Sequence, residues 1–263
     1  MAGSKSVSTS LENSFRVLGV RVDAVQIDDV VRRVQAWIQN RESGQYISVT
    51  GMHGVTEALH DQEFAKVLNA SSLVVPDGMP LVWIGRHRGF PLARRVYGPE
   101  LMETFCARTA HEGYRHFFYG GAPDVAERVA DRLTARFPGL QIAGTFCPPF
   151  RALTQEEDSK IVDLIQLSHA DVVWVGLSTP KQERWMFEHK DKLGVPVLIG
   201  VGAAFDFHAG CMKQAPEWMR ENGLEWLFRL VQEPRRLWRR YLLNGSEFVF
   251  NVALQELRLR RFD

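Results

Sequence analysis

The stretch Asp171-Val-Val-Trp-Val-Gly176 is the clearest indication of the fold. Its interior is a continuous apolar run, and it ends in a glycine that leads into a loop. Such runs are typical of strands that are buried on both faces of a parallel sheet. A second run of the same kind, Val195-Pro-Val-Leu-Ile-Gly200, lies further along the chain. Together the two runs predict neighbouring strands of a parallel sheet.

Strands and helices alternate from Phe15 to about Gly202. Helices are predicted over Asp124–Phe137 and Thr154–His169, the first because Val125, Val129 and Leu133 recur at helical spacing. This alternation predicts an α/β fold with a Rossmann-like, doubly wound and mostly parallel sheet. The remaining predicted strands are Tyr46–Thr50, Leu73–Asp77, His116–Gly120 and Leu140–Gly144.

The 263 residues divide into three parts by composition. Residues 1–14 are polar and Ser-rich, which predicts a disordered tail, and residues 15–209 form the α/β domain. Residues 210–263 form a helical appendage rich in Arg and Trp. The stretch from Arg229 to Arg240 contains five arginines and one glutamate, which gives a local net charge of +4.

Composition and missing motifs exclude several classes of protein. A net charge of +1 argues against a protein devoted to nucleic acid. Three widely spaced cysteines suggest neither a disulfide framework nor a zinc site, so a reducing cytosol is expected. The N-terminus lacks an apolar signal segment, and the longest apolar run, Val195–Phe205, is shorter than the ~20 residues of a membrane span. We therefore expect a cytoplasmic protein whose membrane contact, if any, is peripheral.

Three strand-end loops are expected to meet at one site. They are Pro76-Asp77-Gly78, Tyr119-Gly120-Gly121 and Val175-Gly176-Leu177. In open α/β sheets, ligands bind beyond the carboxyl ends of the strands. Asp77 there is either a general base or a cap for the following helix. Gly120 and Gly121 form either a diphosphate cradle at a helix N-terminus or a plain tight turn.

Further candidate ligands lie in other loops. Either Arg94 or Arg95 suits a diphosphate, although a surface pair is equally consistent with the sequence. In Thr179-Pro-Lys-Gln-Glu183, Lys181 and Gln182 suit an anionic or carbohydrate ligand, while Lys181 and Glu183 are otherwise solvated helix charges. Asp206 follows another strand end and suits a base or ribose, or caps a turn.

Several of these strings together resemble the WecG/TagA/CpsF family, glycosyltransferase family 26, over roughly residues 15–250. The matching strings are Leu73-Val-Val-Pro-Asp-Gly-Met-Pro-Leu-Val82, Arg95-Val-Tyr-Gly-Pro-Glu-Leu-Met102, Phe117-Phe-Tyr-Gly-Gly121, Val175-Gly-Leu-Ser-Thr-Pro-Lys-Gln-Glu-Arg-Trp185, Ile199-Gly-Val-Gly-Ala-Ala-Phe-Asp-Phe207 and Gln232-Glu-Pro-Arg-Arg-Leu-Trp-Arg-Arg-Tyr241.

The resemblance implies transfer of a hexose, such as N-acetylmannosamine, its uronic acid or glucose, from a UDP-sugar to a polyprenyl-diphosphate-linked sugar in the synthesis of bacterial surface polysaccharides. It implies an inverting mechanism with Asp77 as the base. Arg95 and Gln182 would line the substrate site, and Asp206 would help to hold the uridine nucleotide.

One position departs from the family pattern of Thr-x-Asn after the second strand. Here the chain reads Thr50-Gly-Met52, so Thr50 matches and Met52 replaces the Asn, while His53 offers a substitute donor. The donor sugar therefore need not be N-acetylmannosamine, and the neighbouring residues resemble relatives from exopolysaccharide clusters.

The chain lacks D-x-D, H-E-x-x-H and a spaced Cys/His set, which predicts chemistry without a metal or cofactor. The leaving diphosphate would then be stabilised by Arg95, the Gly120-Gly121 turn and arginines of the appendage such as Arg235 and Arg239. The appendage otherwise lies on the anionic inner leaflet, or packs on the core with its arginines in water.

Two other classes of protein remain as alternatives. An NAD-dependent dehydrogenase would also be doubly wound, but the chain lacks its G-x-G-x-x-G fingerprint. A non-catalytic nucleotide-binding or membrane-adaptor protein would keep the glycine turns and the basic appendage without needing Asp77. The oligomeric state is left open, with a homo-oligomer as one possibility.

Overall fold

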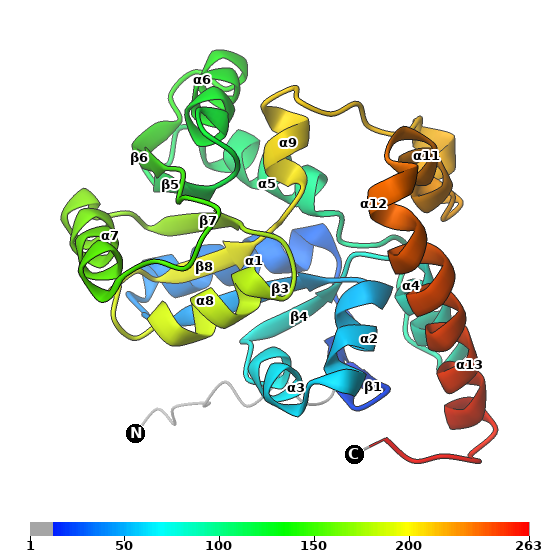
Figure 1. Cartoon of the computed structure of the whole chain (residues 1–263). Coiled ribbons are helices and arrows are strands. Elements are labelled where there is room, and N and C mark those ends of the chain that lie inside the picture. Colours follow the sequence, from blue (N-terminus) through cyan, green and yellow to red (C-terminus); the bar gives the residue numbers. More distant parts are fainter. Residues whose placement is uncertain (1–12, 263) are drawn as a thin grey trace, which may run out of the picture.

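The computed structural model describes residues 13–262, without the side chains of Arg236 and Arg240. Six parallel strands form one sheet in the order β4-β3-β8-β7-β5-β6 (Figure 1). Each predicted strand is confirmed to within two residues at either end. The strands are β3 (Gln45–Thr50), β4 (Leu73–Pro76), β5 (Arg115–Gly120), β6 (Gln141–Phe146), β7 (Val172–Gly176) and β8 (Val197–Gly200).

Helices cover both faces of this sheet, which confirms the doubly wound fold. Alternate residues of one strand enter different cores, because successive side chains point to opposite faces. Ile47 packs with α1, α5, α6 and α9, whereas Tyr46 packs with α7 and α8. The helices are α1 (Ile27–Gln39), α5 (Gly98–Thr109), α6 (Val125–Arg136) and α9 (Ala204–His208) on one face, and α7 (Gln155–Ser168) and α8 (Lys181–His189) on the other.

A short antiparallel hairpin, β1 (Ser14–Val17) and β2 (Val20–Asp23), lies outside the main sheet and was not predicted. Its turn uses Leu18 and Gly19, both with positive φ, rather than the Asn-Gly or Asp-Gly pair that marks such turns in a sequence. The buried carboxylate of Asp23 accepts a hydrogen bond of 2.7 Å from the backbone N–H of Val74 in β4. The hairpin therefore protects the exposed edge of β4 from pairing with other chains.

The C-terminal helices pack against the α/β body as a column beside α2 (Met52–His60) and α4 (Met79–His87) (Figure 1). Phe248 anchors the last helix in a core that it shares with α2, α3 (Gln62–Asn69) and α4. Within the described part of the chain, no helix has both the length and the apolar character to cross a membrane. The column consists of α10 (Glu217–Glu221), α11 (Glu225–Gln232), α12 (Pro234–Trp238), a π-helical turn (Arg239–Leu243) and α13 (Asn244–Glu256).

Candidate active site

A cleft of about 510 Å³ lies at the carboxyl edge of the sheet. Its floor comes from the ends of β3, β4, β7 and β8 and from α9, while α11 and the π-helical turn supply lining residues from the C-terminal column. The position agrees with the rule that open α/β sheets bind ligands beyond the carboxyl ends of their strands. Five residues expected at the site line this cleft, namely His53, Asp77, Arg95, Gln182 and Asp206.

Asp77 lies in the turn that follows β4, and its backbone N–H donates to the Thr50 carbonyl at 2.9 Å. The alternative of a helix cap is wrong, because Gly78 occupies the N-cap position of α4 and receives no side-chain cap. The Oδ1 atom of Asp77 is buried and has no hydrogen-bond partner among the described residues. A buried acceptor without a partner is costly, so it needs an explanation.

The surroundings of Asp77 raise its pKa to about 7. Burial is the largest cause, since it disfavours the charged form, and the charge of Glu225 adds to it. The charge of Arg95, a hydrogen bond from the backbone of Gly98 and the charge of Arg229 oppose the rise. A carboxylate with a pKa near neutrality is suited to accept a proton from a substrate.

Arg95 crosses the cleft between Asp77 and the C-terminal column. Its guanidinium donates to the Asp77 carbonyl at 3.3 Å, pairs with Glu225 and lies 4.1 Å from the centre of the Tyr97 ring. Burial lowers the pKa of Arg95, but the charges of Asp77 and Glu225 outweigh it and raise the pKa overall. Arg95 is therefore a fixed cation at the mouth of the site. Its neighbour Arg94 is exposed and forms ion pairs with Glu100 and Glu221.

The sequence interpretation missed Glu225, Tyr97, Arg229 and Tyr241 as site residues. Glu225 is only 8% exposed and accepts from Arg95 and, at 3.3 Å, from the Tyr97 hydroxyl. Arg229 lines the cleft and lies 5.9 Å from the ring of Phe207. Tyr97 and Tyr241 fall within strings that carry the family resemblance, and Glu225 and Arg229 lie shortly before the last of these strings. No local chemical pattern marks any of the four as a site residue.

Gln182 and Thr50 bring two more buried polar atoms to the same edge. The Oε1 atom of Gln182 and the Oγ1 atom of Thr50 are buried without hydrogen-bond partners in the part of the chain that the structure describes. Gln182 lines the cleft directly, whereas Thr50 lies just below it, next to the lining residue Gly51. The alternative in which Glu183 is a solvated helix charge is wrong, since this side chain is fully buried.

His53 of α2 and Asp206 of α9 both line the cleft. The His53 ring lies 3.6 Å from the Glu57 carboxylate and 3.5 Å from the Asn244 amide of α13. Met52, at the departure from the family pattern, also lines the cleft. An apolar thioether thus lines the cleft at the position where the family pattern has an amide.

The structure does not bring Gly120, Gly121 and Gly176 to the cleft. These glycines instead permit close packing between β5, β7 and α9. A Cβ atom on Gly176 would lie 2.5 Å from the ring of Phe205, and one on Gly120 would lie 2.5 Å from the Gly176 carbonyl oxygen. Gly120 also has a φ of 135°, a region that side chains disfavour.

Lys181, Arg235 and Arg239 are exposed, and none of them lines the cleft. The guanidinium of Arg239 lies 5.4 Å from the ring of Trp238 on the outside of the column. Among the basic side chains that the structure describes in the C-terminal column, Arg229 is the one that lines the cleft.

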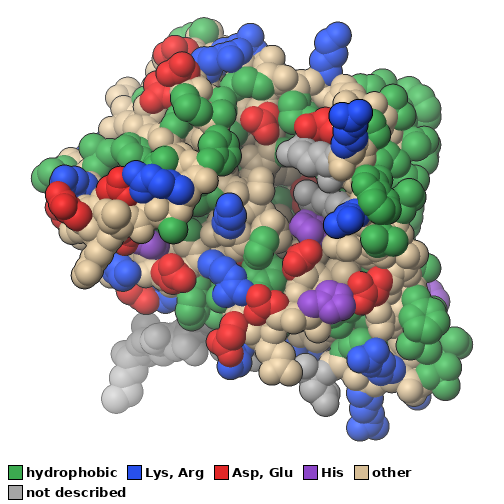
Figure 2. Space-filling view, viewed as in Figure 1, with side chains coloured by type: hydrophobic (Ala, Val, Ile, Leu, Met, Phe, Trp, Pro, Cys, Tyr) green, Lys and Arg blue, Asp and Glu red, His purple; other side chains and the backbone are tan. Residues whose placement is uncertain are grey.

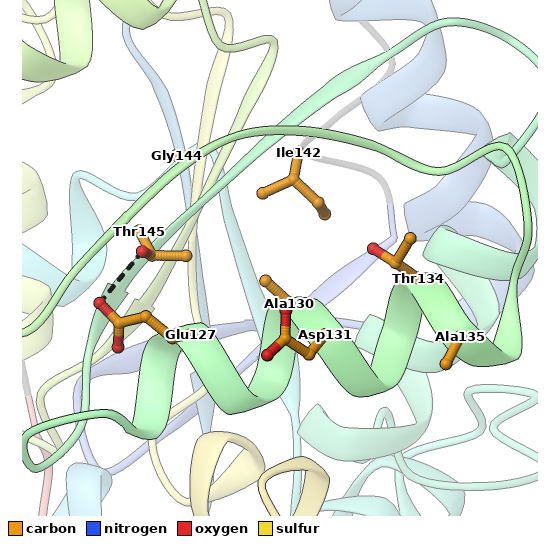
Figure 3. A pocket seen from close by; sticks show the side chains of 8 residues that line it. All are labelled: Glu127, Ala130, Asp131, Thr134, Ala135, Ile142, Gly144 and Thr145. Carbon is orange, nitrogen blue, oxygen red and sulfur yellow. Dashed lines mark hydrogen bonds between the residues drawn. The ribbon is translucent and has the colours of Figure 1, made fainter.

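A second hollow, of about 550 Å³, lies between α6 and the edge strand β6 (Figure 3). Glu127 accepts a hydrogen bond of 3.1 Å from Thr145 there, and Asp131 also lines the hollow. None of the unpartnered buried polar atoms found between residues 13 and 262 belongs to this hollow. We therefore place the candidate active site in the cleft at the carboxyl edge of the sheet.

Comparisons with known proteins identify the family of this chain. The sequence profile of the glycosyl transferase WecG/TagA/CpsF family matches residues 15–262. The chain is similar to an N-acetylglucosaminyldiphosphoundecaprenol N-acetyl-beta-D-mannosaminyltransferase of Staphylococcus aureus strain MW2, with 28% identity over 93% of this chain and 94% of the relative. The enzyme of the same name from strain MRSA252 has the same identity and coverage. This chain therefore belongs to the WecG/TagA/CpsF family of glycosyltransferases.

Proposed function

We propose that this protein transfers a hexose from a UDP-sugar to a sugar linked to polyprenyl diphosphate, and that Asp77 is the catalytic base. The observation that carries the proposal is the buried, unpartnered Oδ1 atom of Asp77 in a cleft at the carboxyl edge of the sheet. The names of the relatives give the acceptor class, a sugar on diphosphoundecaprenol. The proposal does not specify the donor hexose, because Met52 lines the cleft where the family pattern has an Asn.

In the proposed reaction, the acceptor hydroxyl attacks the anomeric carbon of the donor sugar. A new C–O bond forms as the bond from that carbon to the diphosphate oxygen breaks, and the electron pair leaves with UDP. Asp77 takes the hydroxyl proton, which a neutral alcohol must lose to become a good nucleophile. Attack from the face opposite the leaving group inverts the anomeric carbon.

Arg95 would stabilise the negative charge that develops on the departing diphosphate. It is a largely buried cation at the cleft, and its electrostatic effect is stronger there than in water. Arg229 adds a second cation to the lining. The donor and acceptor would meet between Asp77 and these arginines, with Gln182, Thr50 and Asp206 contributing polar contacts.

The test of the proposed function is UDP release in the presence and absence of a lipid-linked acceptor. We expect UDP to be released from a UDP-sugar only when a short-chain polyprenyl diphosphate sugar is added. A screen of UDP-sugars by thermal shift would first identify the donor that binds. If no donor gave release with any acceptor, a non-catalytic nucleotide-binding or adaptor protein would be the better interpretation.

The raised pKa of Asp77 predicts a pH dependence. Below about pH 7 the carboxyl group is protonated and unable to accept a proton, so kcat/KM should rise with pH through an acidic limb near that value. The measurement is the initial rate of UDP release from about pH 5.5 to 9 at low donor concentration. The pH profile of the residual activity of D77N should lack the acidic limb. If the limb persisted in D77N, the titration would belong to another group.

We also propose that the outer face of the C-terminal column rests on the anionic inner leaflet of the cytoplasmic membrane. Large apolar side chains gather along this side of the molecule, with arginines among them (Figure 2). Arg235 and Arg239 are exposed there, where each would contribute about 1 kcal/mol near an anionic surface. The exposed apolar residues here that do not line the cleft are Trp218, Leu227, Val231, Trp238, Leu242, Leu243, Phe250, Leu257 and Leu259.

Vesicle binding of full-length variants tests the membrane proposal. Replacing Leu242, Leu243 and Phe250 together by Ser should abolish most sedimentation with vesicles that contain phosphatidylglycerol, because these side chains are more than half exposed. The matched control replaces Leu164 and Leu167 on α7, which are also exposed, and should bind like the parent protein. Equal binding of both variants would contradict the proposed surface. Neutral vesicles should bind the parent protein more weakly than anionic ones.

A further inference from the structure

We propose that Glu183 is a positioning residue that orients the amide of Gln182, so that its Oε1 atom faces the cleft as an acceptor for a hydroxyl or amide N–H group of the transferred sugar. The inference rests on the proposed function, since it concerns the donor substrate of that same cleft. It begins from an unusual feature of α8, a fully buried glutamate in the first turn of the helix.

Hydrogen bonds join the Glu183 side chain to two residues of the cleft lining, Thr179 and Gln182. Its Oε1 atom accepts a hydrogen bond of 3.0 Å from Gln182 Nε2 and one of 2.8 Å from Thr179 Oγ1. Both donors belong to residues that line the cleft, whereas Glu183 does not line it. Glu183 therefore acts on the ligand through its neighbours.

These contacts determine which way the Gln182 amide points. A glutamate Oε1 that already accepts from a hydroxyl can pair with the NH₂ group of the amide but not with its carbonyl oxygen. Nε2 must then face Glu183, and Oε1 must face the other way. In that direction Oε1 is buried and, within residues 13–262, finds no hydrogen-bond partner.

The end of β8 encloses the amide and keeps it in place. A Cβ atom on Gly200 would lie 3.1 Å from Gln182 Nε2 and 2.6 Å from the Met186 methyl carbon. One on Gly202 would lie 3.4 Å from Gln182 Oε1. Only small residues leave room for the amide here, so packing and hydrogen bonding restrict it together. Gln182 is 2% exposed.

The chemistry of Oε1 selects among the parts of the donor substrate. An amide oxygen accepts hydrogen bonds, so it pairs with a hydroxyl or an N–H group and repels the oxygens of a diphosphate. In the proposed function, the cations Arg95 and Arg229 bind the diphosphate instead. A hydroxyl or N–H group of the bound sugar would give the Oε1 atom of Gln182 a hydrogen-bond partner and so offset the free-energy cost of burying it.

The substitution Glu183→Gln tests the inference. A glutamine at this position can donate to Gln182 Oε1, so the amide no longer has one preferred orientation. We expect KM for the UDP-sugar to rise by about tenfold and kcat to change by less than about threefold, the size of one lost hydrogen bond. Binding of UDP alone should remain unchanged. Equal weakening of UDP and UDP-sugar binding would overturn the assignment to the sugar.

A double-mutant cycle separates positioning from a general structural effect. If Glu183 acts through Gln182, E183Q should add nothing to KM in a Q182A background. Independent, additive effects of the two substitutions would overturn the inference. The control is Glu188→Gln, an exposed glutamate on the same helix, which should leave KM unchanged.

A second measurement covers the case in which E183Q does not fold. Side-chain amide protons of glutamine can be followed by NMR in the unmodified protein, with Q182A identifying the resonances of Gln182. We expect these protons to exchange slowly with solvent, because they are buried against Glu183. Exchange as fast as that of the exposed Gln155 would overturn the inference. The exchange measurement does not depend on turnover. If the protein released no UDP, the proposed function would be contradicted, and the orientation of the Gln182 amide could still be tested.

Discussion

Replacement of Asp77 by Asn is expected to lower turnover by about 10²–10⁴-fold, the usual contribution of a general base. Asparagine has nearly the same shape, but it cannot take the proton of the acceptor hydroxyl. The measurement is kcat for UDP release at about pH 8, where the carboxyl group of Asp77, with a pKa of about 7, is ionised in the parent protein. The affinity for the UDP-sugar should change much less than kcat.

The stability of the D77N variant provides its control. Folding buries a carboxyl group whose pKa rises to about 7 from an ordinary value of 3.8. Because the folded state disfavours the ionised form, this group lowers the stability of the parent protein as pH rises from about 4 to 7. We therefore expect D77N to unfold at the same or a higher temperature at pH 8. Near-normal turnover in a folded D77N protein would remove Asp77 from the mechanism.

Replacement of Arg95 by Gln is expected to reduce kcat by about 10²–10³-fold, as for removal of one group that stabilises developing negative charge. The loss has a second component with a predictable sign. The charge of Arg95 lowers the pKa of Asp77, so its removal should move the acidic limb of the pH profile to higher pH. The measurement is kcat/KM across the same pH range as for the parent protein.

The adjacent arginine is a matched control for this prediction. Arg94 is exposed and pairs at the surface with Glu100 and Glu221, so R94Q should keep its activity to within about threefold. Glu225 raises the pKa of Asp77, so the double variant R95Q/E225Q should bring the limb part of the way back. An unshifted limb in R95Q, or an equal loss of activity in R94Q, would contradict the assigned role of Arg95.

The pattern of apolar residues was sufficient to predict the parallel sheet. Runs such as Asp171–Gly176 are apolar at successive positions, and only a strand covered on both faces buries all of them. The hairpin at residues 14–23 was not predicted, because its strands are four residues long and its turn lacks the usual residues. Its position depends on a contact with β4, about 50 residues away in the chain.

Part of the candidate site was predictable because some of its residues follow a strand end directly. Asp77 is such a residue. The sequence left it as either a base or a helix cap, and the structure excludes the cap because Gly78 occupies the N-cap position of α4. Gly120 and Gly176 also lie at strand ends, but the space beside them is filled, by the backbone of Gly176 in the first case and by the ring of Phe205 in the second. The sequence does not show which side of a strand end the next helix covers.

The sequence by itself therefore determined the fold class, the family and the strand-end position of Asp77, because these depend on local periodicity and on contiguous strings. The tertiary structure decided the electrostatic character of the site. Arg95 and Glu225 are 130 residues apart in the chain, and only folding brings them together beside Asp77. Burial, which raises the pKa of Asp77 to about 7 and leaves its Oδ1 atom without a described partner, is a property of the assembled cleft.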